Sequence, residues 1–549
     1  MKEKYLELMS NALSAYSDEH INEYFARVMT EGLTEHGFPR LTVNIGVLVA
    51  HGYRTDLIPL FIEMMDFCCT EIPRVKAAND FSVREIVFCL LELKNMGKFL
   101  PEIERWKEQL LSIVPEKCYD KYASRSDDVV NNWALFSALS EFARMKLTGC
   151  DSEAFVELQL ENQLRRLDEN GMYADNLKEW NHQPIMYDLV PRYLLTLLLH
   201  FGYKGRHYEK IDAVLKSTAL MTLQMQSLTG EMAFGGRSNQ FVHNEPMLAI
   251  IYEFEANRYA RAGDHKLAGK FKAAIARALE ITEYWLDRKP VRHVKNRFPT
   301  ETRYGCEKYA YFDKYMITTA SHIFSAYMIC DDSIPTGEYD DSDSCFKTGD
   351  RFHKLFMRSG GYFLEFDTDA DLHYDCSGLG RVHRHGAPSP ICMSLPCTDS
   401  PKYKLCTEDK HRASLCPGRV MDGVPVFACD TYGKIEITDY SSNFASLNYP
   451  LDLRADYSID GEGVKVTVNG EGKLLHLLPA FSFDGENETF ITFENDILEV
   501  EYEGWICRYS SNGAIKDLGK TARNRNGFYR LFYAEGESEL SVKIEIFKK

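Results

Sequence analysis

Residues 189–201, LVPRYLLTLLLHF, are apolar on nearly every side of a helix. A helix of this kind is buried all round, so it belongs inside a larger assembly of helices. The helical segment before it, residues 155–167, carries a charged face, which is typical of a helix at the surface. The sequence therefore predicts an inner and an outer layer of helices.

Helical periodicity extends from Lys2 to about Asp331, in about thirteen segments joined by short polar or Gly-containing links. Three polar loops precede helix patterns at a spacing of about 50 residues, which is one helical hairpin per step. The loops are VNNW (residues 130–133), WNHQPIMYD (residues 180–188) and FGGRSNQFVHNEP (residues 234–246). This period predicts an incomplete α/α toroid of about 12–13 helices, formed by residues 1–331.

The helical pattern ends in an acidic, turn-rich segment, residues 331–344, DDSIPTGEYDDSDS. Beyond it, apolar and polar residues alternate between Asp-Gly, Asn-Gly and Gly-Gly turns, which predicts antiparallel strands. The predicted strands include residues 362–366, 434–438, 464–468, 498–502 and 542–547. We therefore expect a linker at residues 332–351 and an antiparallel β-sandwich domain at residues 352–549.

The composition excludes some partners. The chain has 549 residues and a net charge of −17, which argues against a nucleic-acid or anionic-membrane binder, although a pocket can be locally basic. Neither a secretory signal nor a membrane span is predicted, and fifteen irregularly spaced cysteines indicate reduced thiols, so we expect a cytoplasmic protein. We predict no cofactor, and no ligand spacing supports the alternative of a divalent metal. The sequence leaves the oligomeric state open.

The starts of the inner helices of a toroid converge on one rim, so the three loops should line one cleft. Helix N-termini there would favour an anion. The first two loops supply Asn131, Asn132, Asn181, His182 and Tyr187. His182 and Tyr187 are the candidates for proton transfer, and the alternative is an ordinary loop histidine and core tyrosine.

The third loop is the richest in candidate groups. Two glycines let its backbone approach a ligand, and Arg237 after them can bind a carboxylate with two parallel hydrogen bonds. Asn239 can orient a carboxylate, His243 can act as a base or proton donor, and Glu245 can contact the substrate. The alternative is a glycine turn before a capped helix, with Arg237 in a structural ion pair.

The predicted β domain contains a basic, Gly-rich loop, residues 373–389, HYDCSGLGRVHRHGAPS. Loops of this kind often face a neighbouring domain, so we expect it to complete the cleft from the other side, or to form a structural interdomain contact. Its candidate substrate contacts are Tyr374, Arg381, His383, Arg384 and His385. Tyr304, in the basic segment of residues 292–315, is a reserve candidate.

These residues resemble those of the heparinase II/III-like and alginate-lyase-like polysaccharide lyases. Those enzymes place an Asn or Asn-His on one hairpin, a Tyr about one period later and a His in the β domain. The VNNW loop followed by Tyr187, with His182 beside it, fits that order, and so does Asn181-His182 followed by the third loop. His383 or His385 would be the β-domain histidine. The GGRSNQ sequence of the third loop departs from the pattern of the family.

The resemblance implies an α/α toroid followed by antiparallel β-sheets, and β-elimination next to a uronic acid in an oligosaccharide or polysaccharide. The lack of a predicted secretory signal departs from the secreted members of the family and points to imported oligosaccharides as substrates. The loop amides and Arg237 would neutralise the carboxylate, which makes the C5 proton acidic. His182 or Tyr187 would remove that proton, and Tyr187 or His243 would protonate the leaving oxygen. A tyrosine base needs a lowered pKa, which the arginine and the helix N-termini would supply.

Two other functions fit the same scaffold. A glycoside hydrolase needs two carboxylates across the scissile bond, and Asp188 and Glu245, at successive inner-helix starts, are the obvious pair, with Asp375 as a third candidate. Acids at helix N-termini are common for structural reasons, which is the alternative explanation of this pair. The second function is that of a non-catalytic sugar-binding protein.

Overall fold

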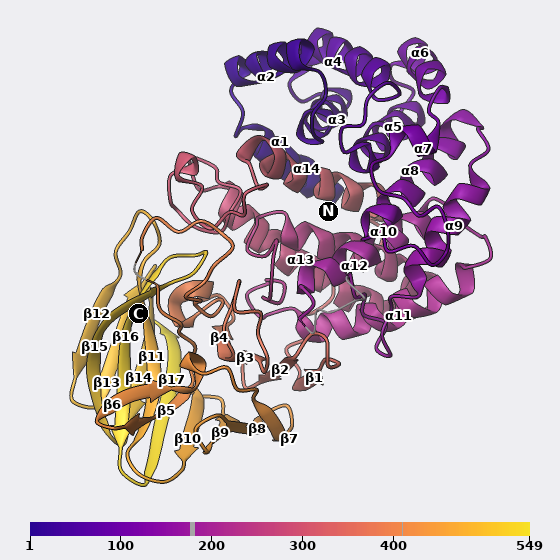
Figure 1. Ribbon diagram of the computed structural model, residues 1–549. Helices are drawn as coiled ribbons and strands as arrows, with labels where there is room; N and C mark the ends of the chain where they lie inside the picture. Colours follow the sequence, from indigo (N-terminus) through magenta and orange to yellow (C-terminus); the bar gives the residue numbers. More distant parts are fainter. Residues whose placement is uncertain (176–181, 409) are drawn as a thin grey trace.

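The structure is a computed structural model that describes residues 1–175, 182–408 and 410–549. Figure 1 shows an array of helices formed by the N-terminal half of the chain and, beside it, the strands of the C-terminal half. The described α-helices are α1 (Lys2–Leu13), α2 (Asp18–Glu31), α3 (Gly37–Ala50), α4 (Ile58–Glu71), α5 (Asn79–Asn95), α6 (Leu100–Leu111), α7 (Pro115–Cys118), α8 (Trp133–Thr148), α9 (Glu153–Leu164), α10 (Ile185–His200), α11 (Tyr208–Met225), α12 (Asn244–Arg261), α13 (His265–Leu286) and α14 (Phe312–Ile329).

Six of these helices form an inner ring: α3, α5, α8, α10, α12 and α14. Each packs against the next, and α14 packs against α3, so the ring is closed. Helices α4, α9, α11 and α13 lie outside the ring and pack against α3, α8, α10 and α12 respectively. The α/α toroid that the sequence predicts is therefore confirmed, and its inner ring is more complete than the sequence indicates.

The apolar segment of residues 189–201 lies in α10 except for its last residue, and nearly all of its side chains are buried. The one arginine of this helix, Arg192, is buried as well, because it pairs with Asp188 one turn earlier. A buried charge is tolerated when it is paired in this way. The charged segment before it falls largely in the outer helix α9, as predicted.

The C-terminal half forms three antiparallel sheets within the described residues. Their strand orders are β1-β2-β3-β4, β12-β13-β14-β17-β10-β9-β8-β7 and β15-β16-β11-β5-β6. The strands are β1 (Ser344–Lys347), β2 (Lys354–Ser359), β3 (Tyr362–Asp367), β4 (Gly378–Arg384), β5 (Pro417–Met421), β6 (Val424–Phe427), β7 (Glu436–Tyr440), β8 (Phe444–Tyr449), β9 (Leu453–Ile459), β10 (Val464–Asn469), β11 (Leu474–Phe483), β12 (Phe490–Glu494), β13 (Ile497–Tyr502), β14 (Trp505–Ser511), β15 (Ala514–Arg523), β16 (Phe528–Gly536) and β17 (Glu539–Lys548).

The eight-stranded and five-stranded sheets share one hydrophobic core, with β11 contacting β10, β13 and β17 across it. Alternation along the strands places the apolar side chains on the inner face. Val464 of β10 lies opposite Ile544 of β17, and Val466 lies opposite Val542, and all four are buried. The predicted β-sandwich is therefore confirmed.

The small sheet β1–β4 lies between the toroid and the sandwich (Figure 1). Phe356 and Phe363 belong to the helical core, whereas Tyr362 and Leu364 of the same sheet belong to the β core. Strand β1 lies inside the predicted linker, so this segment also contributes structure. No helix among the described residues has the length and apolarity of a membrane span.

Candidate functional site

The N-terminal ends of the six inner helices surround a cavity of about 370 Å³, which we call the ring-centre cavity. Its lining includes Arg40 of α3, Phe81 of α5, Tyr187 of α10, His243 at the start of α12 and Lys314 of α14. The positive ends of six helix dipoles therefore point toward one space, which favours a negatively charged ligand there.

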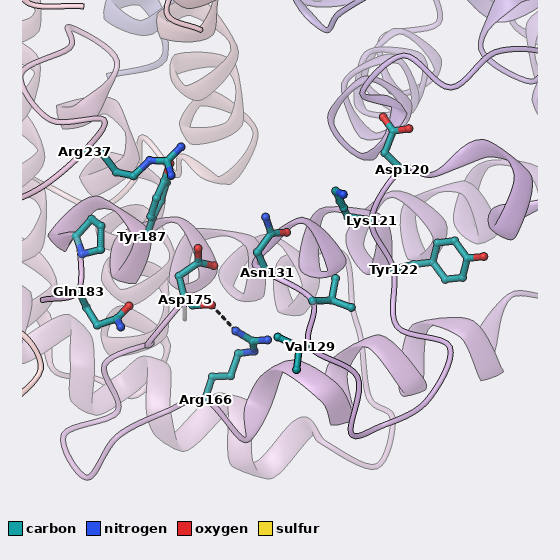
Figure 2. A pocket seen from close by; sticks show the side chains of 12 residues that line it. Asp120, Lys121, Tyr122, Val129, Asn131, Arg166, Asp175, Gln183, Tyr187 and Arg237 are labelled. Carbon is teal, nitrogen blue, oxygen red and sulfur yellow. Dashed lines mark hydrogen bonds between the residues drawn. The ribbon is translucent and has the colours of Figure 1, made fainter. Parts of the chain in front are cut away.

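A second cavity, of about 400 Å³, adjoins the first, and we call it the outer cleft. Figure 2 shows Asn131, Asp175, Tyr187 and Arg237 around this space. Tyr187 and Arg237 line both cavities, so they mark the passage between them. The VNNW loop and the third loop therefore lie at one rim, as their spacing predicts.

Arg237 lies between two tyrosines. Its guanidinium carbon is 5.2 Å from the ring centres of both Tyr187 and Tyr309, and its Nε donates a hydrogen bond to the Tyr309 hydroxyl at 3.4 Å. No ion pair joins Arg237 to a carboxylate within the described part of the chain. The cation is therefore oriented by aromatic rings, and the residues that surround it leave it able to bind an anionic ligand.

The backbone around Arg237 requires its glycines. Gly236 has φ +74°, and a Cβ there would lie 2.9 Å from the Cα and Cβ atoms of Pro184. Ser238 and Gln240 also have positive φ, at 62° and 64°. These left-handed residues turn the chain sharply at the cavity, as the Gly-Gly pair predicted.

Two carboxylates bind the amides on either side of Arg237. Asp375 accepts a hydrogen bond from the Gly236 amide at 2.8 Å, and Glu307 accepts one from the Ser238 amide at 2.7 Å. Arg525 of the β domain donates to both carboxylate oxygens of Glu307, at 2.8 and 2.9 Å. The β domain thus holds the loop directly through Asp375 and indirectly through Arg525.

These two carboxyl groups have opposite pKa shifts. Burial raises the pKa of Asp375 to about 7. Burial acts in the same direction on Glu307, but the charge of Arg525 and the hydrogen bonds outweigh it, so the pKa of Glu307 is lowered. Neither Glu307 nor Arg525 was singled out from the sequence, because their pairing joins residues 218 positions apart.

A short chain of hydroxyls connects the two tyrosines. The Tyr309 hydroxyl lies 2.9 Å from the Ser238 Oγ, which lies 3.4 Å from the Tyr187 hydroxyl. Burial raises the pKa of Tyr187 well above its usual value, and the charge of Arg237 offsets only part of this effect. The expectation of a lowered pKa for a tyrosine base is therefore wrong for Tyr187, which keeps its proton and suits an acid.

The two asparagines of the VNNW loop differ in their contacts. Asn132 donates from its backbone amide and its Nδ2 to Asp175 Oδ1, at 2.9 and 3.0 Å. The Asn131 side chain accepts a hydrogen bond from the Trp133 amide at 3.2 Å and lines the outer cleft. Asp175, whose pKa is raised by burial, is a cleft residue that the sequence analysis missed.

His243 lies in the wall of the ring-centre cavity. Its ring stacks on Phe241, with an angle of 12° between the planes, and contacts Tyr315 and His322. Its Nδ1 is buried without a partner among the described residues. Burial, reinforced by His322, lowers the pKa of His243 well below its usual value, so the imidazole is neutral at ordinary pH.

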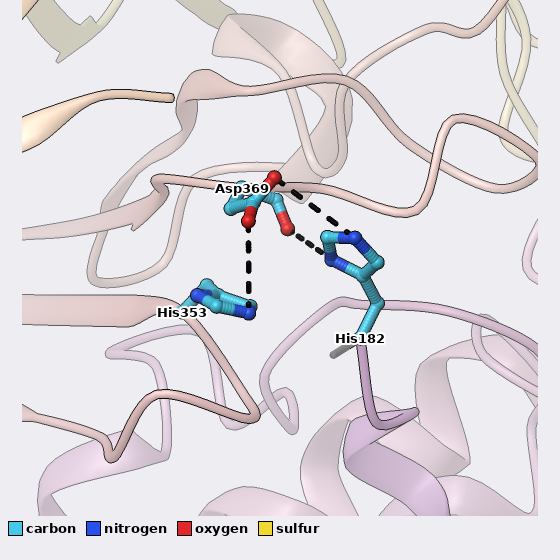
Figure 3. Close-up of side chains that lie close together, drawn as sticks. All are labelled: His182, His353 and Asp369. Carbon is cyan, nitrogen blue, oxygen red and sulfur yellow. Dashed lines mark hydrogen bonds and ion pairs between the residues drawn. The ribbon is translucent and has the colours of Figure 1, made fainter. Parts of the chain in front are cut away.

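His182 lies elsewhere. It lines neither cavity and instead approaches Asp369 and His353, as Figure 3 shows. Ligand atoms of these three residues lie within 4.8 Å of one another, and two imidazoles with a carboxylate form a donor set that zinc accepts. The ammonium of Lys434 also pairs with Asp369. His182 is therefore separated from Tyr187, the residue with which the sequence analysis paired it, because its partners come from the β half.

The carboxylates proposed for hydrolysis are internal. Asp188 pairs with Arg192 and accepts the Tyr173 amide at 2.8 Å, while Glu245 pairs with Lys295 at 2.6 Å. All of these side chains are buried, and neither carboxylate lines the two cavities. Their positions at helix starts thus reflect structural ion pairs.

Two other candidates also have structural contacts. The Asn239 side chain bonds to the Ala233 carbonyl and to Gln240, at 3.0 and 2.8 Å, and does not line either cavity. The Tyr304 hydroxyl donates to the Asn524 carbonyl at 2.8 Å. Asn181 lies outside the described residues.

The basic loop of the β domain reaches the toroid through Asp375, Arg381 and His383. Tyr374 beside it lies within electrostatic reach of Arg237; burial raises its pKa to about 12, and Arg237 opposes the shift. Three of the other candidates already have protein partners: Arg381 pairs with Glu365 at 3.0 Å, His383 bonds to Ser227 at 2.6 Å, and Arg384 bonds to Tyr362 at 3.1 Å. His385 lines a separate groove with Trp505.

Comparisons with known proteins concern the overall arrangement. No protein-family profile matches the sequence, and a search of curated proteins finds no match. Among solved structures, heparinase III is 8% identical, with a TM-score of 0.48 over 92% of this chain and 77% of that one. A chondroitin AC lyase from Streptomyces coelicolor A3 is 11% identical, with a TM-score of 0.45 over 99% and 83%. A heparan sulfate lyase mutant from Pedobacter heparinus is 9% identical, with a TM-score of 0.43 over 93% and 76%. These structures include heparinase-like lyases, which the sequence resembles.

Proposed function

We propose that the protein is a lyase that cleaves uronic-acid-containing oligosaccharides or polysaccharides by β-elimination, at the passage between the outer cleft and the ring-centre cavity. The observation that carries the proposal is Arg237, a cation between two tyrosines, without a carboxylate partner among the described residues, at the N-terminal ends of the inner helices. A uronate carboxylate would complete this site.

The reaction needs one proton removed and one proton supplied. Binding of the carboxylate to Arg237 makes the C5 proton more acidic, and the neutral His243 takes that proton. The C4–O bond then breaks as the C4–C5 double bond forms, and Tyr187 donates its proton to the leaving oxygen. Tyr309, linked to Tyr187 through Ser238, provides a route for returning that proton.

An absorbance assay tests the proposal. The purified protein is incubated with heparan sulfate, chondroitin sulfate, alginate and polygalacturonate, and the ultraviolet band of the new C4–C5 double bond is followed. A rising band in at least one reaction is the expected result. Release of reducing ends without this band would contradict elimination.

Hydrolysis is the second candidate, but its two carboxylates would differ from the pair expected from the sequence. Asp120 and Asp175 both line the outer cleft, whereas Asp188 and Glu245 do not. A hydrolase would use such a pair as acid and base across the scissile bond. New reducing ends without the ultraviolet band, abolished by D120N and by D175N, would establish this reaction in place of elimination.

A further inference from the structure

The walls of the ring-centre cavity come from every helix of the closed inner ring. The lining residues include Arg40 of α3, Phe81 of α5, Phe136 of α8, Tyr193 of α10, Met247 of α12 and Thr318 of α14. Because each inner helix packs against the next, the six helices form a continuous ring around the cavity. A polymer cannot pass through such a wall.

The floor of the cavity is also occupied. Glu85 pairs with Arg40 at 3.0 Å and with Arg84 at 2.8 Å, and Ser321 donates to the same carboxylate at 2.6 Å. Arg84 is fully buried beneath the ring of Phe136. This ion-pair layer fills the ring below the cavity, so the way in is from the side of Tyr187 and Arg237, which the outer cleft shares.

The cavity contains a second cation besides Arg237. Lys314 lines it, is half-buried, and forms no ion pair with any residue that the structure describes. The carboxylate of Glu35 acts on Lys314 electrostatically but is bound by the Gly37 amide and the Tyr24 hydroxyl. Arg40 also lines the cavity, but its charge is neutralised by the ion pair with Glu85.

The size of the cavity limits its occupant. A volume of about 370 Å³ is near the lower end of the range for ligand pockets, which is roughly 300–1,000 Å³. Aromatic side chains line much of it, and sugars present apolar faces to such rings while their charged groups need cations. One or two sugar units with an anionic group meet these conditions.

We propose that the ring-centre cavity receives the terminal acidic sugar of a chain, with the anionic group of that sugar at Lys314, so that the enzyme releases saccharides from a chain end. This inference rests on the proposed elimination at Arg237. The C5 hydrogen leaves as a proton, the C4–O bond breaks, the C4–C5 double bond forms, and the oxygen that departs is protonated. Each turnover shortens the chain by the small saccharide held in the cavity.

The sizes of the earliest products test the inference. The polymer that gives an ultraviolet band is digested to a few per cent, and the products are separated by size while the viscosity is recorded. We expect a single small saccharide, of one or two sugars, with the viscosity almost unchanged. A ladder of oligosaccharides and a rapid fall in viscosity, with the band present, would overturn chain-end action alone. Absence of the band on every polymer would overturn the proposed function and this inference with it.

Substitution of Lys314 tests its role directly. K314M should raise KM for the acidic polymer at least tenfold, while K314R should retain most of the affinity. The exposed Lys98, changed to Met, is the matched control. Thermal unfolding of all three variants establishes that they fold. An unchanged KM in folded K314M would overturn the assignment of Lys314.

Discussion

At the scale of single residues, Arg237 is distinguished by the kind of contact that holds it. Most buried arginines of this protein pair with carboxylates, for example Arg192 with Asp188 and Arg525 with Glu307. Arg237 packs instead against aromatic rings, an interaction worth about 0.5–2 kcal/mol, which orients the guanidinium without neutralising it.

The first prediction concerns this guanidinium. R237Q removes the charge that would stabilise the developing carboxylate negative charge, so kcat/KM should fall about 10²–10³-fold. R237K keeps the charge but loses the two parallel hydrogen bonds, so its activity should lie between those of R237Q and wild type.

Steady-state rates from the ultraviolet band check this order. R454Q, which alters an exposed arginine of the sandwich, is the control and should be as active as wild type. Equal rates for R237Q and wild type would show that Arg237 does not take part in the reaction.

The second prediction concerns Asp375, whose pKa burial raises from 3.8 to about 7. Between about pH 4 and pH 7 the folded protein keeps a proton that the unfolded chain has released. The contribution of this carboxyl to the free energy of unfolding is therefore complete below pH 4 and is lost as the pH rises through 7. The shift corresponds to a difference on the order of 4 kcal/mol.

The D375N variant isolates this contribution, because its amide oxygen still accepts the Gly236 hydrogen bond but does not titrate. Urea unfolding of both proteins between pH 4 and 8 should show a steeper decline of stability with pH in the wild type. Parallel curves would mean that Asp375 does not titrate in this range.

At the scale of elements, the loop that carries Arg237 depends on the close approach of Gly236 to Pro184. The third prediction is that G236A is destabilised by more than the strain of its backbone conformation. The positive φ alone costs roughly 1–2 kcal/mol for an L-residue, and the contact with Pro184 adds to this.

Gly423 provides a matched control, because it has φ +79° and no atom within 4 Å of a Cβ placed there. G423A should therefore lose only the backbone term and keep its activity. G236A should be less stable than G423A in urea and should lose activity as Arg237 shifts. Equal losses of stability would show that the loop adapts to the methyl group.

The sequence predicted the elements well because local periodicity decides them. In the inner helix of residues 189–201 and in the alternating strands, the order of apolar and polar residues alone indicates which side chains are buried. The meeting of the three loops at one rim was also predictable, because the loops recur once per helical hairpin.

The partners within the site were not predictable, because they come from distant parts of the chain. The orientation of His182 depends on Asp369, and the burial of Glu245 depends on Lys295, neither of which lies nearby in the sequence. The Asp188–Arg192 pair is the exception, because a spacing of four residues on a helix indicates such a contact.

At the scale of the whole molecule, the toroid and the β half meet at the buried pair Arg525–Glu307, beneath the loop of Arg237. The fourth prediction is that R525M costs about 3–5 kcal/mol of stability, because it leaves the carboxylate of Glu307 buried without its cation. The double variant R525M/E307Q should be less destabilised than the sum of the single variants.

Urea unfolding of the four proteins in this cycle measures the coupling. K549M, which breaks an exposed pair with Glu501, should change stability by less than about 1 kcal/mol. Additive losses for Arg525 and Glu307 would show that the two side chains do not support one another.

The contacts on either side of Arg237 also limit how this protein can be divided or recombined. The helices form the ring-centre cavity, but Asp375 and Arg525, which hold the loop of Arg237 in place, belong to the other half of the chain. A chimaera with a foreign sandwich would inherit the cavity and lose the placement of its main cation. An exchange that keeps the placement of Arg237 would therefore have to transfer both halves as one unit.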